Sequence, residues 1–423
     1  MENQRNFEPE VSVLTAGRDR HYSLGLAMAL AAANVRFDFI ASDELESDEL
    51  RESPLADFLN LRGDQSVDAG LLKKTWRVLV YYFRLLAYSV RTKSKIFHIL
   101  WNNKFEWFDR TLLMVFYRLL GKKIAFTAHN VNAGARDGCD SFLNRASLRF
   151  QYRLCDRIFV HTKKMKAELI SDFDILEDKI VLIPFGLNNA VPTTALGRVE
   201  ARSRFHLRPD DKVILFFGNI APYKGLEFLI DAFGELAPHD SSLRLIIAGR
   251  PKGSKSYWEK IQKDIGACAS QAGIVQKIEY ICDEEIEIYF KAADVLALPY
   301  VHIFQSGVLF LSYSFGLPVI ATDVGSLREE ILEDKTGLVC APQNPGALAG
   351  AIQNYFQSDL YGQLESRRRE IQDFAREKYS WSKVGAITAA VYSEVLQSGS
   401  NPFSKRGKNN EAFSLDSHSS PQR

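Results

Sequence analysis

Residues 216–225 read FFGNIAPYKG, so an apolar run ends at Gly218 and Lys224 stands just before the next helical pattern. A glycine lets the backbone approach a ligand closely, and a lysine offers a point charge to a phosphate group. Taken alone, these ten residues fit better a lysine that is solvated on a surface loop. The order of strands and helices around this stretch therefore decides what it means.

Apolar runs of strand length alternate with helical patterns from Lys212 onward. The expected strands are Val213–Phe217, Leu243–Ala248, Ile278–Ile281, Val295–Leu298 and Val319–Thr322. The expected helices lie at about Leu226–Leu236, Tyr257–Ala272, Glu284–Ala292, Gly307–Phe315 and Pro345–Phe356. This alternation indicates a parallel sheet that is covered by helices on both faces.

The first half of the chain shows the same alternation. Its expected strands are Val11–Ala16, Val35–Ala41, Ile96–Trp101, Lys123–Thr127, Asp156–Val160 and Lys179–Ile183. A helix from about Tyr22 to Ala33 should follow the first strand. A chain of 423 residues also exceeds what one hydrophobic core usually organises. We therefore predict an α/β fold of two facing, doubly wound, Rossmann-like domains. Ligands should bind in the cleft between them, beyond the carboxyl ends of the strands.

The predicted domain boundary lies between Leu187 and Asp211, where residues 188–197 read NNAVPTTALG and are rich in turn formers. We assign residues 1–190 to an N-terminal domain and residues 191–378 to a C-terminal domain. A last helix within residues 379–397 should pack back on the N-terminal domain, with Ser380 as its N-cap. Residues 398–423 have few apolar side chains, and we expect them to be a disordered tail.

Bulk composition excludes several classes of protein. Hydrophobic residues make up 46% and charged residues 25%, and the net charge of +1 gives no reason to expect nucleic-acid binding. The five cysteines are scattered and never form a C-x-x-C pair, which argues against a disulfide framework or a zinc site and fits a reducing cytoplasm. The polar, acidic N-terminus does not resemble a signal peptide. No apolar run reaches the roughly 20 residues of a membrane span.

Two more turns follow strands of the second half. In the first, residues 305–309 read QSGVL, where Ser306 is a natural N-cap and Gly307 leaves the first helical turn open. Free N–H groups at a helix start bind phosphate well, although a capped core helix has the same pattern. In the second, Gly316 and Pro318 introduce a strand that ends near Gly325, and we interpret these residues as architecture.

The order and spacing of these pieces resemble the family 4 glycosyltransferases, which have the GT-B architecture. The stretches that carry the resemblance in the second half are FFGNIAPYKGLEFLIDAF, LRLIIAGRP, YICDEEIEIYFKAADVLALPY and QSGVLFLSYSFGLPVIATDVG, followed by the turn at residues 336–339. RDRHYSLGLAMAL, KIAFTAHNV, IFVHTKKMKAEL and KIVLIPFG resemble the family more weakly in the first half. No single stretch is specific for the family, whereas the order of all the stretches along the chain is specific for it.

In that family the lysine of the KG turn grips the donor diphosphate, so the resemblance gives Lys224 that catalytic role. An arginine often follows the strand-end glycine, where this chain has Asn219 after Gly218. Many members also carry two glutamates that contact the donor sugar and ribose. The corresponding positions here are Ile303 and Leu311, so both carboxylates are absent.

This chain instead resembles the branch of the family with a QSGVL turn. Residues of that turn would face the donor's phosphates and sugar, and the loop at residues 280–283 would lie against its base. The donor-binding residues that the resemblance implies are Gly218, Asn219, Lys224, Tyr280, Ile281, Gln305, Ser306, Gly307 and Val308.

In the N-terminal half the resemblance implies an acceptor-side domain. His129 follows a strand and resembles the histidine that family members place beside the transferred sugar, although a histidine at such a place is more often structural. Gly17 and Arg18 occupy the first turn, near the sugar and acceptor, but the usual double glycine is missing. His21 and Tyr22 match a common segment to which we give no role.

The implied function is a retaining transfer from a nucleotide-diphosphate sugar to a glycan or lipid-linked saccharide, as in surface polysaccharide or glycoconjugate synthesis. No bound cofactor and no metal are expected, because the donor is a substrate and leaving-group charge falls on Lys224 and a helix start. A sugar-nucleotide epimerase and a phosphorylase-like enzyme share the architecture. A non-catalytic member that binds a sugar nucleotide is the remaining alternative.

Residues 71–95 contain seven basic side chains and no acidic one. Arg77, Arg84 and Arg91 recur every seven residues and so share one helical face. The other face carries the apolar side chains Trp76, Leu79, Val80, Phe83, Leu86 and Val90. Such a helix fits contact with the inner face of the plasma membrane, and it fits equally a domain helix whose apolar side is in the core.

Overall fold

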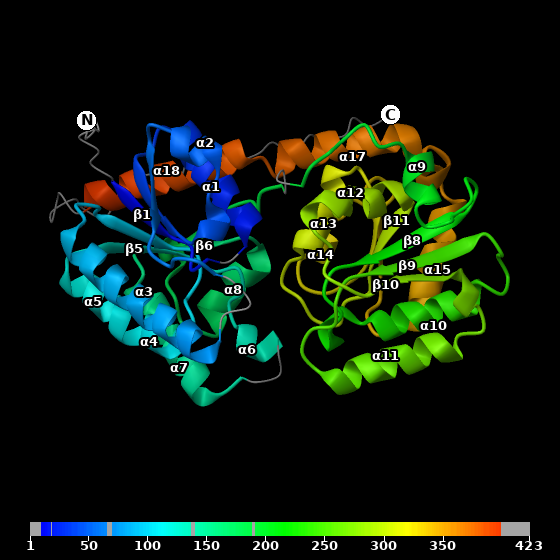
Figure 1. Cartoon of the computed structure of the whole chain (residues 1–423), viewed down its shortest axis with the longest axis horizontal. Coiled ribbons are helices and arrows are strands. Elements are labelled where there is room, and N and C mark those ends of the chain that lie inside the picture. Colours follow the sequence, from blue (N-terminus) through cyan, green and yellow to red (C-terminus); the bar gives the residue numbers. More distant parts are fainter. Residues whose placement is uncertain (1–9, 18, 66–69, 137–139, 188–190, 399–423) are drawn as a thin grey trace, which may run out of the picture.

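The computed structural model describes residues 10–17, 19–65, 70–136, 140–187 and 191–398. Two α/β domains lie side by side, each built on a parallel sheet with helices on both faces (Figure 1). This confirms the predicted fold class of two facing, doubly wound domains. Arg18 and the predicted tail beyond Ser398 lie outside the described residues.

The N-terminal sheet has seven parallel strands in the order β3-β2-β1-β4-β5-β6-β7. Their bounds are β1 Val11–Leu14, β2 Phe37–Ala41, β3 Ala56–Asn60, β4 Ile96–Ile99, β5 Lys123–Thr127, β6 Arg157–Val160 and β7 Ile180–Leu182. The sequence did not predict β3. It is an edge strand, paired only with β2, and none of its side chains is fully buried, so it lacks the apolar run of its neighbours.

The helices of this domain fill the connections between the strands. They are α1 Arg20–Ala32, α2 Asp48–Glu52, α3 Leu71–Arg91, α4 Glu106–Phe108, α5 Met114–Leu119, α6 Ala133–Arg136, α7 Phe142–Leu154 and α8 Lys163–Ser171. A π-helical turn over Asp109–Leu113 joins α4 to α5. None of the described helices is both long and apolar enough to cross a membrane.

The C-terminal sheet has six parallel strands in the order β10-β9-β8-β11-β12-β13. Their bounds are β8 Lys212–Phe217, β9 Leu243–Ala248, β10 Ile274–Lys277, β11 Val295–Leu298, β12 Val319–Thr322 and β13 Gly337–Cys340. The predicted strand Ile278–Ile281 is wrong: the strand is β10, four residues earlier, and residues 278–281 form the loop that follows it. The segment predicted as a turn at residues 336–339 enters the edge strand β13.

The helices of this domain include the five predicted ones. Four of these have their predicted bounds to within one residue, whereas the helix predicted at Tyr257–Ala272 begins two residues and ends five residues earlier than predicted. The helices of the domain are α9 Arg198–Ser203, α10 Leu226–Leu236, α11 Lys255–Ala267, α12 Asp283–Ala292, α13 Gly307–Ser314, α14 Leu327–Glu330, α15 Pro345–Gln357, α16 Asp359–Gly362 and α17 Leu364–Lys378. The sequence did not predict α17, because only Leu364, Ile371 and Ala375 of its fifteen residues are buried.

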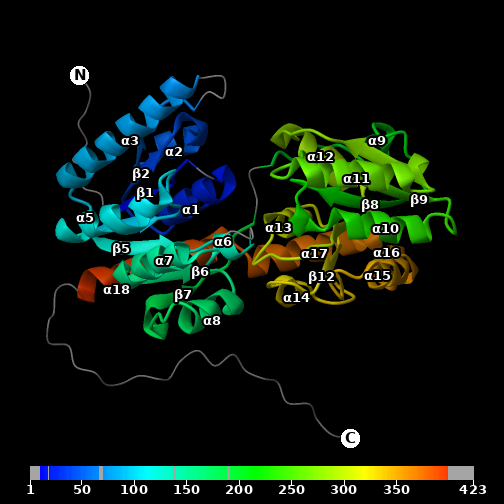
Figure 2. The same cartoon turned by 90° about the horizontal axis from the view of Figure 1, so that it is seen from below.

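The last helix, α18 (Trp381–Ser398), returns to the N-terminal domain and packs along α1 (Figures 1 and 2). Its first residue anchors the crossing. The Trp381 indole donates a hydrogen bond to the carbonyl oxygen of Leu187 at 2.7 Å. A Cβ atom on Gly25 would lie 2.1 Å from the Trp381 ring, and one on Gly186 would lie 2.6 Å from it. The ring therefore fits only because both positions lack a side chain.

Replacing Gly25 by Ala should destabilise the protein by about 1–3 kcal/mol, because the added methyl group overlaps the Trp381 ring. Gly350 in α15 is the matched control, since it is also helical and a Cβ there meets nothing within 4 Å. Gly350→Ala should stabilise by up to about 1 kcal/mol through helix propensity alone. Chemical denaturation of both variants tests this, and a shift of the same sign in both would contradict the packing.

Candidate functional site

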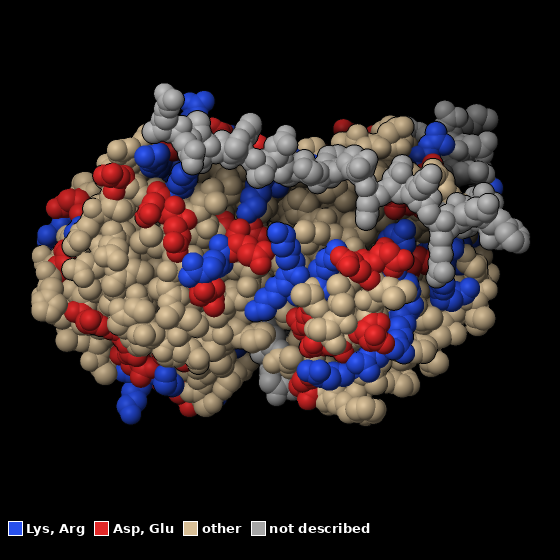
Figure 3. Space-filling model, turned by 180° about the vertical axis from the view of Figure 1, so that it is seen from behind, with Lys and Arg blue, Asp and Glu red and all other residues tan. Residues whose placement is uncertain are grey.

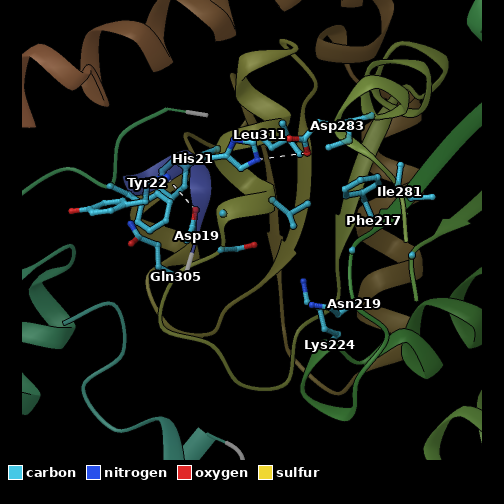
Figure 4. Close-up of a pocket in the computed structure, with 18 of the residues that line it drawn as sticks. Asp19, His21, Tyr22, Phe217, Asn219, Lys224, Ile281, Asp283, Gln305 and Leu311 are labelled. Atoms are coloured by element: carbon cyan, nitrogen blue, oxygen red, sulfur yellow. Dashed lines mark hydrogen bonds and ion pairs between the residues drawn. The ribbon is translucent and has the colours of Figure 1, made fainter. Parts of the chain in front are cut away.

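A cleft of about 520 Å³ lies between the two domains, beyond the carboxyl ends of β1 and β8 (Figure 4). Three parts of the chain meet there. The N-terminal domain contributes Asp19, His21 and Tyr22. The segment that joins the domains contributes Phe185, Gly186 and Leu187, and the last helix, α18, contributes Trp381. Strand ends and helix starts of the C-terminal domain contribute the remaining lining residues. Every donor-binding residue predicted from the sequence lines this cleft: Gly218, Asn219, Lys224, Tyr280, Ile281, Gln305, Ser306, Gly307 and Val308.

Lys224 is a buried cation with a neutral partner. It ends a 3₁₀ turn (Pro222–Lys224) after β8, and its side chain is 6% exposed. Its Nζ donates to the hydroxyl of Tyr300 at 2.6 Å and lies 4.4 Å from the centre of that ring. Burial lowers the pKa of the Lys224 ammonium to about 8, because taking the charge out of water is not balanced by a nearby carboxylate. An anion in the cleft would supply the missing counter-charge.

Ser306 stands at the N-cap of α13, but its side chain does not cap the helix. Its hydroxyl lies 3.2 Å from the hydroxyl of Tyr300 instead, which corrects the predicted capping role. The first N–H groups of a helix have no acceptor within the helix, and here they belong to the cleft-lining residues Gly307 and Val308. Tyr300 thus links the lysine to the helix start. Sequence reasoning missed it, because a tyrosine at a strand end carries no motif.

Gly218 keeps open the space between Lys224 and α13. Its φ is +104°, which a side chain rarely adopts. A Cβ atom there would lie 3.6 Å from a methyl carbon of Val308 and 3.7 Å from the Lys224 Nζ. Together, the ammonium group, the helix N-terminus and the Asn219 side chain surround a small electropositive corner, which suits an anion of phosphate type.

A second side of the cleft suits a flat ring. Ile281 is buried, whereas Tyr280 is 63% exposed and holds the Arg250 guanidinium 5.2 Å from its ring centre. Phe217 and Ile286 add apolar surface, and in Figure 4 Ile281 and Phe217 lie together on one wall. Arg250 was not predicted from the sequence, although it directly follows the strand-end glycine of β9.

The positions of the missing glutamates lie where the resemblance places them. Ile303 and Leu311 both line the cleft, so a carboxylate at either position would face the ligand. Near them, the amide oxygen of Gln305 is buried and has no hydrogen-bond partner among the described residues. Where many family members have two carboxylates, this cleft therefore has two apolar side chains and, near them, an amide oxygen that can accept a hydrogen bond.

His129 lies at the end of β5, inside a group of aromatic rings. The Trp101 indole stacks on its imidazole with 4.2 Å between ring centres, and the Tyr22 ring meets it edge-on at 4.5 Å. Burial, reinforced by His161 and His98, holds the pKa of His129 well below its usual range, so the ring is neutral. His129 and Gly17 are not among the residues that line the cleft, whereas Tyr22 is.

A neighbouring histidine sets the tautomer of His129. Nδ1 of His161 lies 3.4 Å from the carbonyl oxygen of Ile183, which can only accept, so this nitrogen carries the proton. Burial lowers the pKa of His161 to about 4, so its Nε2 is unprotonated and accepts from Nδ1 of His129 at 3.2 Å. Nε2 of His129 is then a free lone pair, and it is buried with no partner among the described residues.

A contact between a histidine ring and a carboxylate crosses the cleft. Nε2 of His21 lies 3.7 Å from a carboxylate oxygen of Asp283 at the start of α12, and this contact is dashed in Figure 4. Asp19, in a left-handed conformation, accepts a hydrogen bond from the Tyr22 N–H and so begins α1. His21 and Tyr22, which had no role assigned from the sequence, therefore form the N-terminal wall of the cleft.

Two family models match the chain, one in each half. The model described as Glycosyltransferase Family 4 matches residues 21–190, and the model described as Glycosyl transferases group 1 matches residues 211–358. The two matches together cover about three quarters of the chain.

Curated relatives and solved structures agree with these matches. A D-inositol 3-phosphate glycosyltransferase of Corynebacterium efficiens is 29% identical over 248 residues, which cover 56% of this chain and 56% of that protein. The chain thus matches little more than half the length of such relatives. Sucrose-phosphate synthase from Thermosynechococcus elongatus superposes with a TM-score of 0.73 at 18% identity, over 92% of this chain and 100% of that one. HepE from Anabaena, solved with UDP and glucose, gives 0.69 at 14% identity, over 91% and 99%. Both likenesses show the shared fold.

Proposed function

We propose that the chain, as a glycosyltransferase of the GT-B architecture, moves a sugar from a nucleotide-diphosphate sugar to a glycan or lipid-linked saccharide. The observation that carries the proposal is the electropositive corner, where the buried Lys224 and the start of α13 face one space that Gly218 keeps open. A diphosphate in that corner would neutralise a charge that the empty protein leaves unbalanced.

The chemistry we propose retains the anomeric configuration. The bond between the anomeric carbon and the diphosphate oxygen breaks, and an acceptor hydroxyl forms the new bond from the same face. The acceptor's proton passes to the departing phosphate oxygen. Negative charge that develops on the leaving group is stabilised by the Lys224 ammonium and the N–H groups of α13, so the scheme assigns this work to the chain and not to a bound cofactor.

The other ligand groups fall to the remaining walls of the cleft. We assign the nucleotide base to the side formed by Tyr280 and Ile281, and the transferred sugar to the side of Gln305. The free lone pair on Nε2 of His129 would accept a hydrogen bond from a sugar hydroxyl, once the Tyr22 side chain moves away from it.

A location at the inner face of the plasma membrane, in surface polysaccharide or glycoconjugate synthesis, is part of the proposal. The support for this location comes from the exposed surface of α3, which lies at the front in the view of Figure 1. The core face of α3 is formed by Tyr81, Tyr82, Leu85 and Ser89, whereas Phe83, at 74%, is among its most exposed side chains. Four of the six side chains in the apolar stripe recognised in the sequence, Trp76, Leu79, Phe83 and Val90, are exposed. Leu86 of the same stripe packs against the domain core. The exposed part of the stripe supports membrane contact.

A screen of nucleoside diphosphates tests the donor site. At least one of UDP, GDP and ADP should raise the melting temperature at pH 7, by the equivalent of about 3 kcal/mol at a hundred times its Kd. Since the charged lysine is the binding form and its pKa is about 8, affinity should fall about tenfold between pH 7 and pH 9.

Lys224→Arg is the matched variant, because arginine stays charged throughout this range and should lose the pH dependence. Absence of any nucleotide effect, or an equal pH dependence in the variant, would contradict the diphosphate site. Conversion of the donor to an epimerised nucleotide sugar, with no transfer, would point to the epimerase alternative.

A further inference from the structure

Two hollows adjoin on α3, outside the cleft. The first, here called the apolar groove, has a volume of about 480 Å³ and runs between α3 and the stretch from α4 to α5; it is lined by Phe83, Leu86, Ala87, Val90, Phe108, Leu112, Leu113 and Phe116. The second, here called the basic pocket, has a volume of about 170 Å³ and is lined by Arg62, Gln65, Lys74, Arg77, Val78, Tyr81, Tyr82, Asn103 and Lys104.

The apolar groove is exposed to solvent. Val90 is 62% exposed and Leu112 is 58% exposed, on opposite sides of it. Trp76, Leu79, Trp107 and Leu119 extend exposed apolar surface along the same helices. Contiguous apolar surface of this kind marks a binding site in a soluble protein, because it costs free energy while it faces water.

The basic pocket brings four cationic side chains together, on α3 and on the loops after β3 and β4. The Arg62 guanidinium donates to the Asn103 amide oxygen at 3.1 Å and lies 4.7 Å from the Tyr81 ring centre, which holds it in place. Arg77 donates to the carbonyl oxygen of Asp64 at 2.6 Å. On the opposite face of the molecule, shown in Figure 3, basic and acidic side chains are interspersed, whereas residues 71–95 contain no acidic residue.

Asp109 is a buried acid whose hydrogen-bond partners, Tyr82 and Asn103, line the basic pocket. Asp109 accepts hydrogen bonds from the Tyr82 hydroxyl at 2.9 Å and from the Asn103 amide at 3.3 Å. Burial raises the pKa of Asp109 to about 6. Both hydrogen bonds end on Oδ1, whereas Oδ2 is buried with no hydrogen-bond partner among the described residues. This one buried acid stands against four cationic side chains in the pocket lining, so the balance of charge favours an anion.

The two hollows lie next to each other and lead toward the cleft. Tyr82 lines the basic pocket, and its ring meets Phe108 of the apolar groove edge-on, 5.4 Å between centres. On the other side, a Cβ atom on Gly17 would lie 3.0 Å from Nε of Arg62, so the pocket backs onto the turn between β1 and α1. That turn ends at Asp19, which lines the cleft. Groove, pocket, turn and cleft thus follow one another across the N-terminal domain.

We infer that the groove and the pocket bind an acceptor that carries a phosphate or diphosphate on a long hydrocarbon chain. The phosphate lies in the basic pocket, the hydrocarbon lies in the apolar groove, and the saccharide extends past the first turn into the cleft. Only an amphiphile uses both hollows, since a free sugar phosphate would leave the groove in water and a neutral lipid would bring no anionic group to the four cations of the pocket. This inference rests on the proposed glycosyl transfer and names its acceptor class.

Binding of dodecyl phosphate, kept below its micellar concentration, tests the inference without a membrane surface. The full chain should bind it saturably, followed by the fluorescence of Trp76 and Trp107 or by thermal shift. Two double variants address the hollows separately: Phe83→Ser/Leu112→Ser in the groove and Arg62→Gln/Arg77→Gln in the pocket. Each should weaken binding at least tenfold, since each removes one half of the contacts.

The matched control is Arg84→Gln/Arg91→Gln, which removes two exposed charges of α3 that line neither hollow. It should change affinity less than about threefold, as expected for solvated charges. Equal losses in the pocket and control variants, equal binding of dodecyl maltoside, or equal binding of inorganic phosphate would each overturn the inference. So would light scattering that shows a dimer of the native chain which the groove variant alone disrupts.

Nucleotide-induced stabilisation of the same variants separates this inference from the proposed function. It should be unchanged in all three double variants, because the donor corner lies in the other domain. If the native chain binds dodecyl phosphate but no nucleoside diphosphate, the proposed function is contradicted. If it binds a nucleoside diphosphate but not dodecyl phosphate, only the acceptor site is contradicted.

Discussion

Replacing Lys224 by Met should lower the turnover of the donor by about a hundredfold to a thousandfold, the usual cost of removing one charge from a leaving-group site. Methionine is unbranched and only one atom shorter than lysine, so it fills most of the corner beside Gly218. Donor hydrolysis without an acceptor is the assay, with the nucleotide found by the screen. Lys252→Met is the control, because Lys252 is exposed and does not line the cleft.

The same substitution should stabilise the empty protein at neutral pH. The folded-state pKa of Lys224 is about 8 against 10.5 for a free lysine, so the charged side chain costs the fold about 3 kcal/mol below pH 8. This cost shrinks as the pH rises from 8 to 10.5 and vanishes above that range. Lys224→Met should therefore raise the melting temperature more at pH 7 than at pH 9.5. Unchanged turnover, or a loss of stability that is the same at both pH values, would contradict the assignment.

Replacing His129 by Phe should lower turnover by about tenfold, which is the upper end of what one hydrogen bond to the sugar contributes. Phenylalanine preserves the stack on Trp101 and the contact with Tyr22 but removes the free lone pair of Nε2. Because the electropositive corner lies in the other domain, nucleotide-induced stabilisation should stay within about twofold of the native value.

The exposed His239, in the C-terminal domain, provides the control variant His239→Phe. A His129→Phe variant with native turnover would leave the histidine with a structural role only. If nucleotide binding and turnover were lost together, the substitution would have disturbed the fold or the domain arrangement, and the assignment to the sugar would have no support.

The strands and helices that sequence reasoning placed well have strong local signals. Helix Leu226–Leu236 was predicted with its observed bounds, because Gly225 precedes it and its apolar residues recur at helical spacing. The predicted strand at Ile278–Ile281 was wrong for a tertiary reason. Two apolar runs lie close together in GIVQKIEYI, and only pairing of Ile274 with Leu245 of β9 selects the first as the strand. The second run then extends past the sheet and into the cleft.

The candidate site divides in a similar way. Strand-end glycines and helix starts are local features, so Gly218, Lys224 and Gly307 could be found from the sequence, and all three line the cleft. Arg250 and Tyr300 could not be found, because each reaches the site from another strand end and neither belongs to a spacing pattern. The stacking of Trp101 on His129, and the tautomer that His161 imposes, likewise depend on strands that are adjacent only in the folded sheet.

The sequence by itself determined the alternation of strands and helices, the doubled α/β architecture and the turns where a ligand can approach, because each of these is written in neighbouring residues. Tertiary structure decided which side of each element is buried. It turned four of the six apolar side chains in the α3 stripe toward solvent, and it placed the Tyr300 hydroxyl beside the Lys224 ammonium, 76 residues away. Burial and charge balance are properties of a position in the folded chain, and they give Lys224 its lowered pKa and its place for an anion.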